Sequence, residues 1–508
     1  MEPLYTHETV PADQQRHITA SNEGMSLRWW ETFSSQTILH IIALAVFSSA
    51  LYLPMIGRGF VLDDFGHVFV TEFESINFGL FHASGGPYYA PVAWLTFKID
   101  WILFGARAYP WAATNLVIHI ANTLLLYFLA LRLWRSPMAA WWTALGFALL
   151  FTGNVNAMMF ISTRAHLVVT FFYLAAMLST LWLLSTERFK LPAAAAVLAA
   201  GALAIFTKES GVMVIAAIAL ILLYERKVRN RGLGTSLIGS LFAGLSAAFA
   251  LYLGLRARSS AVPISFSGDP CCSYSLSLRV FSNNLVYYVE QTYGLVLLTA
   301  AAIVISLLLR GRRLNLSSLT RYDILFSVML FSSAVAPFML LAQEHEHYCY
   351  LPGIGAALGL GQLRGFDSNS SSTKPIFTLA ALVPVALVIA FSVTSTVKDA
   401  HKWIQLAETN RSVLAQIAAE QPAMRHNTFV LLTYAETDWG NRFPEGFGDF
   451  AFPYALHDLY RDRTVGGLVH LQGAPYSIDA DMYEIDFSYV GSRPPVVTKT
   501  AELTSHNP

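Results

Sequence analysis

Phe60-Val61-Leu62-Asp63-Asp64-Phe65-Gly66 places two adjacent carboxylates directly after the first long apolar segment of the chain, Ile38 to Ile56. That segment is long enough to cross the hydrocarbon core of a bilayer, and no small-residue cleavage site follows it, so we expect a retained first span. Ionisable residues at such a boundary commonly serve function. The acid pair therefore marks the first candidate site, at the end of a predicted membrane helix.

The composition is that of a membrane protein. Of the 508 residues, 55% are hydrophobic and 13% are charged, whereas soluble domains carry about 25% charged residues. Lysine plus arginine and aspartate plus glutamate number 33 each, so no bulk basicity indicates nucleic-acid binding. The three cysteines exclude a disulfide scaffold, and their spacing is not that of a zinc site.

Apolar stretches recur along the chain and predict a polytopic α-helical membrane protein. After the first span, they lie at about 112–134, 138–152, 167–185, 192–207, 211–224, 235–255, 286–309, 322–341, 349–363 and 375–396. We therefore expect about 11 transmembrane helices within a membrane domain of residues 36–396. Residues 1–35 are polar and lack apolar periodicity, so we expect a disordered cytoplasmic tail there.

Alternate loops concentrate lysine and arginine, which orients the spans because cytoplasmic loops carry the excess of these residues. The basic loops contain Arg132 and Arg135; Arg188 and Lys190; Arg226, Lys227, Arg229 and Arg231; and Arg310, Arg312, Arg313 and Arg321. With these loops inside, an odd number of spans places the N-terminus in the cytoplasm and the C-terminus outside. The acid pair and the long first outer loop, 57–110, then face the extracytoplasmic side. Cys271, Cys272 and Cys349 also fall in predicted outside loops, where one of the neighbouring pair could bridge to Cys349.

Residues 397–508 regain charged side chains and have shorter apolar runs, which predicts a small extracytoplasmic α/β domain. His401 to Gln421 and Tyr454 to Arg461 have helical character. Thr428 to Tyr434 and Val465 to Leu471 are β-rich.

The acid pair has the features of a general base. If Leu62 to Phe65 is extended, Asp63 and Asp64 project to opposite faces, so one points into a pocket while the other bonds loop backbone or a cation. Mutual repulsion and burial would raise the pKa of one carboxyl and improve it as a proton acceptor. We favour Asp63 as the base, with Asp64 bracing the loop. The alternative is that both acids only terminate the first span.

Two predicted helices near the acid pair carry polar residues. Asn115, His119 and Asn122 share one face of the second span and must therefore face protein. Hydrogen bonding between helices is preferred there over ligand binding. Trp94 to Phe104, in the first outer loop, has an apolar helical face and predicts a helix lying in the membrane interface.

Two cations are predicted at lipid-headgroup depth. Arg164 lies in an outer loop, and Lys208 lies beside Glu209 at the outer end of the fifth span. An anionic lipid phosphate entering from the outer leaflet would be stabilised there by charge-assisted hydrogen bonds. The alternative is snorkelling of Lys208 to ordinary headgroups, which the accompanying Glu209 disfavours.

The stretch Gln343-Glu344-His345-Glu346-His347-Tyr348 mixes acids and imidazoles before the tenth predicted span. A divalent metal could bind such side chains, with Glu344 and Glu346 as ligands, although the spacing is not that of a zinc helix motif. A position beside the phosphate is the more economical role, so we expect no cofactor to be required.

In their order along the chain, these motifs resemble the GT-C superfamily of integral-membrane glycosyltransferases. The similarity is to the protein O-mannosyltransferase-like branch, which includes transmembrane tetratricopeptide-repeat mannosyltransferases and their bacterial relatives. It covers nearly all of 36–396, whereas the repeats themselves are absent. The matching stretches are Phe60-Val61-Leu62-Asp63-Asp64, Asn115-Leu116-Val117-Ile118-His119-Ile120-Ala121-Asn122, Ile161-Ser162-Thr163-Arg164, Thr207-Lys208-Glu209, Tyr252-Leu253-Gly254-Leu255-Arg256 and Tyr348-Cys349-Tyr350-Leu351-Pro352-Gly353.

Three stretches depart from the pattern of that family. Tyr89-Ala90-Pro91 stands where relatives have Tyr-Arg-Pro, and Asn154-Val155-Asn156-Ala157 stands where they have His-x-Glu-Ala. Glu346-His347-Tyr348 replaces their Glu-Arg-Tyr. Two arginines and an acid are therefore missing, which leaves a specialised or a catalytically degenerate enzyme as alternatives.

The resemblance implies inverting transfer of a sugar from a polyprenyl-phosphate-sugar donor to a hydroxyl of a protein or glycan. Asp63 or Asp64 would take the acceptor proton. Arg164, Lys208 and His347 would hold the phosphate. The implied substrate- and phosphate-binding set also includes Glu209, Tyr348 and His119, and a divalent cation is optional.

The resemblance also implies a location. We expect a bacterial inner membrane with the site facing the periplasm, or the endoplasmic reticulum membrane in a eukaryote. The competing hypothesis is a flippase or transporter of lipid-linked sugars. It is disfavoured because no inverted repeat is evident and because charge gathers on one side of the membrane, not at the midplane.

Overall fold

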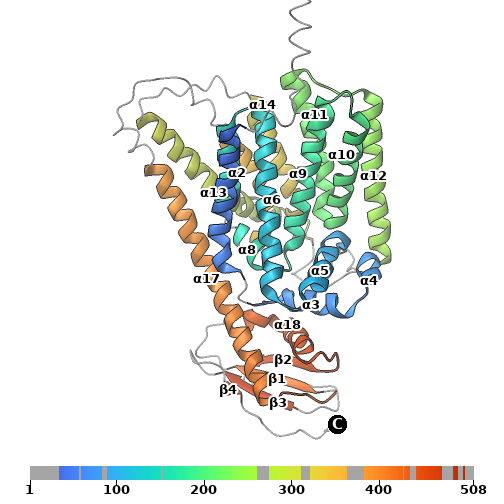
Figure 1. Cartoon of the computed structure of the whole chain (residues 1–508), viewed down its shortest axis with the longest axis vertical. Helices are drawn as coiled ribbons and strands as arrows, with labels where there is room; N and C mark the ends of the chain where they lie inside the picture. The colour runs from blue at the N-terminus through green and yellow to red at the C-terminus, as the bar shows by residue number, and fades with distance from the viewer. Residues whose placement is uncertain are drawn as a thin grey trace, which may run out of the picture.

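The computed structural model describes residues 34–56, 59–82, 89–149, 153–259, 274–309, 321–362, 383–426, 428–434, 442–471, 484–489 and 496–497. They form a helical bundle connected by one long helix, α17, to a small domain built on a sheet (Figure 1). Nearly all of the predicted tail, 1–35, lies outside the described residues, as do Cys271 and Cys272. Cys349 is a buried free thiol in this structure, and its pairing stays a prediction.

Five described helices are long and apolar enough to cross a membrane. They are α2 (Ser35–Tyr52), α6 (Ala108–Trp134), α9 (Arg164–Ser185), α10 (Lys190–Thr207) and α12 (Thr235–Arg258). The bent pair α7 (Pro137–Leu149) and α8 (Gly153–Met159) adds a sixth if it forms one span. Other predicted spans correspond to α11 (Val214–Arg229), α13 (Leu278–Leu309), α14 (Arg321–Val335), α15 (Gly353–Gly361) and the start of α17 (Val383–Glu420). The helical membrane class is confirmed, and the number of 11 spans stays a prediction.

Helix α9 lies at the centre of the bundle, in contact with α6, α10 and α11. Its side chains are apolar on every side, and Leu167, Tyr173 and Leu174 are fully buried. A helix that is apolar all round lies in a protein core or in a membrane. Contacts with α6, α10 and α11 hold α9, and the residues of the site meet at its first turn.

The two ends of the bundle differ in character. Helices α3 (Asp63–Phe73), α4 (Ile76–Phe81) and α5 (Pro91–Phe104) lie at the end that faces the sheet domain (Figure 1). At the other end of α6, the Arg229 guanidinium of α11 donates to the backbone oxygens of Arg132 and, at the next residue, Leu133. The basic ends of α6 and α11 thus lie opposite the acid pair, as the predicted orientation requires. The orientation itself stays a prediction.

The C-terminal domain consists of the second half of α17, α18 (Arg442–Tyr460) and four strands. The strands are β1 (Phe429–Tyr434), β2 (Gly466–Leu471), β3 (Glu484–Tyr489) and β4 (Val496–Val497), in the order β2-β1-β3-β4. Strand β1 is parallel to β2 and β3, while β4 is antiparallel to β3. The helix α18 makes the crossover from β1 to β2, which is the usual way to join parallel strands.

Helix α17 runs across the predicted domain boundary. A last span ending at 396 and a domain beginning at 397 were predicted, and one helix of 38 residues, Val383–Glu420, passes through that point. The return of charged residues after Val397 marks a change in what surrounds the helix and not its end. Helix α17 therefore belongs to both the bundle and the C-terminal domain, and it connects them without a break.

A second apolar core joins the C-terminal domain to the acid-bearing end of the bundle. Phe65 and Val68 of α3 pack in it with Phe97 of α5. The C-terminal domain contributes Val413 and Ile417 of α17, Val430 and Leu432 of β1, and Phe447, Phe452 and Leu456 of α18. Burial of these large side chains stabilises the contact, at about 25 cal/mol for each Å² of apolar surface removed from water. The helix that carries the acid pair is thus clamped between α5 and the C-terminal domain.

Candidate active site

The acid pair begins a helix instead of lying in an extended segment, so the predicted local geometry is wrong. Helix α3 starts at Asp63, and the Asp64 N–H donates to the Val61 carbonyl at 3.0 Å, which closes a turn. Successive residues of a helix project about 100° apart and not to opposite faces. The two carboxylates nevertheless enter different environments, because one side of α3 faces the bundle.

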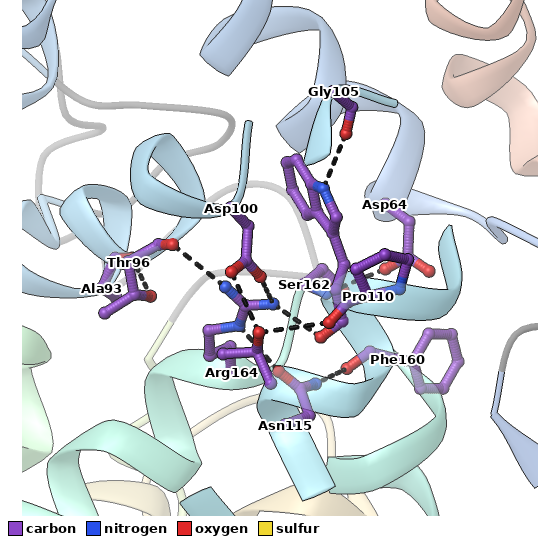
Figure 2. Close-up of polar contacts among 12 residues, drawn as sticks. Asp64, Ala93, Thr96, Asp100, Gly105, Pro110, Asn115, Phe160, Ser162 and Arg164 are labelled. Atoms are coloured by element: carbon purple, nitrogen blue, oxygen red, sulfur yellow. Dashed lines mark hydrogen bonds and ion pairs between the residues drawn. The ribbon is translucent and has the colours of Figure 1, made fainter. Parts of the chain in front are cut away.

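Asp64 is the buried member of the pair, with 0% of its surface exposed. Its Oδ1 accepts from the backbone N–H of Ser162 at 2.8 Å (Figure 2). Its Oδ2 accepts from the Val61 N–H at 3.2 Å. Burial raises the pKa of Asp64 to about 7, against the opposing effect of these two donors. Asp64 therefore ties the acid turn to the segment that enters α9, as the bracing role predicts.

Asp63 is the accessible member of the pair. Its side chain is exposed, although nearby protein atoms still desolvate the carboxylate enough to raise its pKa. A carboxylate with a raised pKa and an open path to solvent is the better proton acceptor of the two. The burial pattern thus agrees with the choice of Asp63 as the base, while its activity stays a prediction.

Arg164, predicted to hold phosphate, is fully buried and surrounded by protein partners (Figure 2). It forms an ion pair with Asp100 at 2.6 Å, and its Nε donates to Asn115 Oδ1 at 2.7 Å. Its remaining hydrogen bonds reach the backbone oxygens of Thr96, at 3.2 Å, and Trp111, at 2.8 Å. These contacts join α5, α6 and α9, so the guanidinium positions three helices against one another.

Lys208 follows α10 and reaches the first turn of α9. Its Nζ lies 2.7 Å from Nε2 of His166 and 5.2 Å from the ring centre of Tyr348. Burial lowers the pKa of Lys208 to about 8, while the neighbouring Glu209 carboxylate acts in the opposite direction. Lys208 is thus a desolvated ammonium close to neutral pH. Its partner Glu209 pairs with Arg256 of α12 at 2.7 Å.

His166 is a residue of this cluster that the sequence analysis missed. A lysine ammonium can only donate, so His166 accepts at Nε2 and carries its proton at Nδ1. That buried Nδ1 has no hydrogen-bond partner among the described residues. The only sequence signal was position, since His166 lies two residues after Arg164, the last residue of a motif that was already recognised.

His347 and Tyr348 lie against the same cluster, as the predicted phosphate site requires. They belong to η6 (Glu346–Cys349), and the His347 ring centre is 4.9 Å from that of His166. Burial, together with the nearby Lys208 ammonium, holds the pKa of His347 well below its usual range. At neutral pH the His347 imidazole is therefore uncharged. Lys208 carries the positive charge of the cluster, which consists of Lys208, His166, His347 and Tyr348.

His119 lies within the bundle, where its Nδ1 is 2.8 Å from the Tyr350 hydroxyl. Asn122 donates to the same hydroxyl at 3.2 Å and to the Leu167 carbonyl at 2.9 Å. These contacts connect α6 with α9 and with the residues before α15, as the preferred interpretation of interhelical hydrogen bonding predicts. Substrate binding by His119 stays a prediction.

The acids proposed as metal ligands are Glu344 and Glu346. Glu346 accepts from Asn156 Nδ2 at 2.8 Å, and Asn156 in turn accepts from the indole of Trp403 at 2.9 Å. Within the part of the chain that the structure describes, no group of three or more histidine, cysteine or acidic side chains is arranged to hold a metal ion. Glu346 joins η6 to α8 and α17.

The residues that lead into α9 bring the two halves of the site together. Ser162 contacts the acid turn through Asp64, whereas His166 contacts Lys208. Four residues separate them, which is about one helical turn. An exposed carboxylate and a half-buried ammonium therefore lie near the two ends of one short segment, at the end of a membrane bundle.

Comparison with known proteins supports the fold and leaves the activity open. No protein-family model and no curated protein sequence matches the chain. The oligosaccharyltransferase AglB of Archaeoglobus fulgidus, solved with an inhibitory peptide and a dolichol-phosphate, matches in structure with a TM-score of 0.50 at 11% identity, over 86% of this chain and 65% of that one. The chain resembles AglB in fold.

A second solved structure is ArnT from Cupriavidus metallidurans bound to undecaprenyl phosphate, which matches with a TM-score of 0.47 at 12% identity, over 84% of this chain and 89% of that one. At these identities the comparisons show a shared fold, and the GT-C superfamily inferred from the motifs stays a prediction. The O-mannosyltransferase-like branch is not distinguished from other branches.

Proposed function

We propose that the chain is a membrane glycosyltransferase that moves a sugar from a polyprenyl-phosphate-sugar donor to an acceptor hydroxyl of a protein or glycan. The observation that carries the proposal is that both charged parts of the site meet the start of α9. The turn bearing the exposed Asp63 is tied to Ser162 through Asp64, and the half-buried Lys208 ammonium contacts His166. The fold shared with AglB is consistent with this chemistry. The acceptor approaches on the extracytoplasmic side, to which the basic-loop pattern assigns this end of the bundle.

The transfer is a single displacement with inversion at the sugar. The acceptor oxygen forms a bond to the anomeric carbon while the bond from that carbon to the phosphate oxygen breaks. The acceptor proton goes to the Asp63 carboxylate, and the electron pair of the broken bond leaves with the polyprenyl phosphate. One base suffices because a phosphate leaves as a stable anion and needs cations more than a general acid.

The leaving phosphate is held by Lys208 and His166. The Lys208 ammonium supplies charge-assisted hydrogen bonds, and the His166 Nδ1–H is a buried donor without a described protein partner. His347, which stands where relatives have arginine, packs against His166 as a neutral ring. Arg164 is a positioning residue in this proposal, because Asp100 and Asn115 already engage its guanidinium.

Transfer by purified protein tests the proposal. The protein is reconstituted in liposomes and supplied with a panel of radiolabelled polyprenyl-phosphate sugars, together with hydroxyl-bearing peptides and glycans. We expect label to move from at least one donor to an acceptor, and we expect Asp63→Asn to abolish the movement. Transfer without metal and in the presence of chelator would agree with a cofactor-free site.

Two outcomes would count against the proposed transfer. Label that crosses the bilayer while remaining on the prenyl lipid indicates a flippase. Consumption of no donor by well-folded protein indicates a degenerate enzyme. In both cases the contacts described above keep their structural meaning, and the catalytic role of Asp63 is rejected.

A further inference from the structure

The backbone at Leu62, directly before the acid pair, has a conformation that L residues avoid. Its φ is 48° and its ψ is −127°, and the hydrogen bond from the Asp64 N–H to the Val61 carbonyl closes the turn around it. These angles are those of the second residue of a type II′ turn, where glycine is the usual residue. A leucine persists there only if its surroundings enforce the conformation.

The chain entering this turn is held by helix α17 of the C-terminal domain. Asn410, which is 1% exposed, donates from Nδ2 to the Phe60 carbonyl at 3.2 Å. Val61 packs against Leu406 and Ala407. At Gly59, whose φ is 143°, a Cβ would lie only 3.1 Å from the Ala407 carbonyl oxygen. The three residues before Leu62 are thus fixed by one face of α17.

The helix that leaves the turn is held by the same domain along its whole length. Phe65 stacks on Phe447 of α18 with ring centres 5.7 Å apart, and Phe69 packs on Tyr454 at 5.1 Å. At the far end of α3, Glu72 and Glu74 pair with Arg461 and Arg463. The C-terminal domain therefore contacts the chain both before and after the Leu62 turn, although neither of the two acids belongs to it.

We propose that the C-terminal domain holds the Leu62 turn in its unfavourable conformation and thereby positions the acid pair, with Asn410 as a positioning residue that acts through the Phe60 carbonyl. The consequence for catalysis rests on the proposed function. The turn points the Val61 N–H at Asp64 Oδ2 while Asp63 stays exposed. If Leu62 relaxed to a negative φ, the Val61 N–H would rotate away from the Asp64 carboxylate. The Asp63 carboxylate would then change its position relative to Lys208.

Asn410 and Leu62 can be tested together because the proposal predicts a specific rescue. Asn410→Leu and Asn410→Ala remove the donor, so the turn relaxes. Adding Leu62→Gly removes the free-energy cost of a positive φ at position 62. The turn should therefore regain its original conformation even without Asn410. Adding Leu62→Ala shortens the side chain as well but keeps that cost, and it serves as the matched control.

The first readout needs no substrate. Hydrogen exchange of the peptide covering 59–66 is measured in detergent-purified protein. We expect each Asn410 variant to speed exchange there by about tenfold, Leu62→Gly to restore protection, and Leu62→Ala not to restore it. Unchanged exchange in both Asn410 variants, or equal rescue by glycine and alanine, would overturn the proposal.

The second readout is transfer activity. Asn410→Leu should lower kcat by about tenfold with the donor KM within about twofold, and the addition of Leu62→Gly should recover kcat. Arg463→Gln, which loosens only the exposed far end of α3, should change neither parameter. A rise in KM without a fall in kcat would contradict positioning of the base. Rescue of exchange in a protein that transfers no sugar in any form would reject the proposed function and support the positioning.

Discussion

The carboxylate of Asp64 accepts a hydrogen bond from the backbone N–H of Ser162 at 2.8 Å, across 98 residues of chain. This bond links the turn after the first helix of the bundle to the start of α9, which is largely buried. His166, about one helical turn further along, contacts Lys208. The acid and cationic parts of the candidate site are therefore held by one short segment, and changes in that segment should affect both.

Removing each acid separately should distinguish the base from its support. Asp63→Asn is expected to lower transfer by about two to four orders of magnitude, the size of a general-base effect. Asp64→Asn should lose less, because the neutral side chain still accepts from one backbone donor. Both are measured as initial rates at equal protein level in liposomes. Full activity in both variants would show that this turn is not the catalytic centre.

The stability of the protein should depend on pH through Asp64. Burial raises the pKa of Asp64 from 3.8 to about 7, so between these values the folded state binds a proton that the unfolded chain does not. Stability therefore falls as pH rises through this window, by about 4 kcal/mol for this group. Thermal unfolding in detergent is compared between the wild type and Asp64→Asn. Between pH 5 and pH 8 the Tm of the wild type should fall by more than the Tm of Asp64→Asn, because only the wild type loses the stabilisation from the Asp64 proton. Parallel plots of Tm against pH for the two proteins would contradict a raised pKa of Asp64.

Lys208 should govern binding of the donor lipid. Lys208→Met removes the half-buried ammonium, and the donor KM should rise by about ten- to a hundredfold, the range of a charge-assisted hydrogen bond. Lys402→Met is the control, because it removes one exposed positive charge elsewhere in the chain. The two variants are compared by donor titration in the transfer assay. Equal KM values would remove Lys208 from the phosphate site.

Gly153 should tolerate no larger residue, because α8 approaches η6 closely at this point. A Cβ there would lie 2.5 Å from the Glu346 carbonyl oxygen and 3.1 Å from the Cys349 Cβ. Gly153→Ala should therefore destabilise the protein by about 1–3 kcal/mol as η6 is displaced. Gly239→Ala is the control, since no atom lies within 4 Å of the added Cβ near the start of α12. A melting temperature that is equal in both variants would contradict the close contact.

Reporter fusions should establish the orientation. A reporter placed after Pro508 is expected to be active only outside the cytoplasm, and one placed after Arg231 only inside. The structure places the basic ends of α6 and α11 opposite the acid turn, so the two reporters must disagree if the bundle spans the membrane. The reverse pattern would assign the acid pair to the cytoplasmic face.

Helix α5 illustrates what could be predicted about the site region, and Asp64 illustrates what could not. The helix from Pro91 to Phe104 agrees with the predicted segment from Trp94, because the apolar face of a helix is visible in its own sequence. The opposite projection of the two acids was argued on the condition that Leu62 to Phe65 is extended, whereas α3 begins at Asp63. The residues before Leu62 pack against α17, a contact that the local sequence does not indicate.

The sequence by itself determined the membrane class, the main helices, the acid pair and the two predicted cations, because apolar length and charge are local properties. Only the tertiary structure decided which acid is buried, that Asp100 engages Arg164, and that His166 joins Lys208. The tertiary structure also decided that the C-terminal domain packs against the acid turn. These are contacts between residues far apart in the chain, and their partners are chosen by how whole helices pack, which no local pattern of residues records.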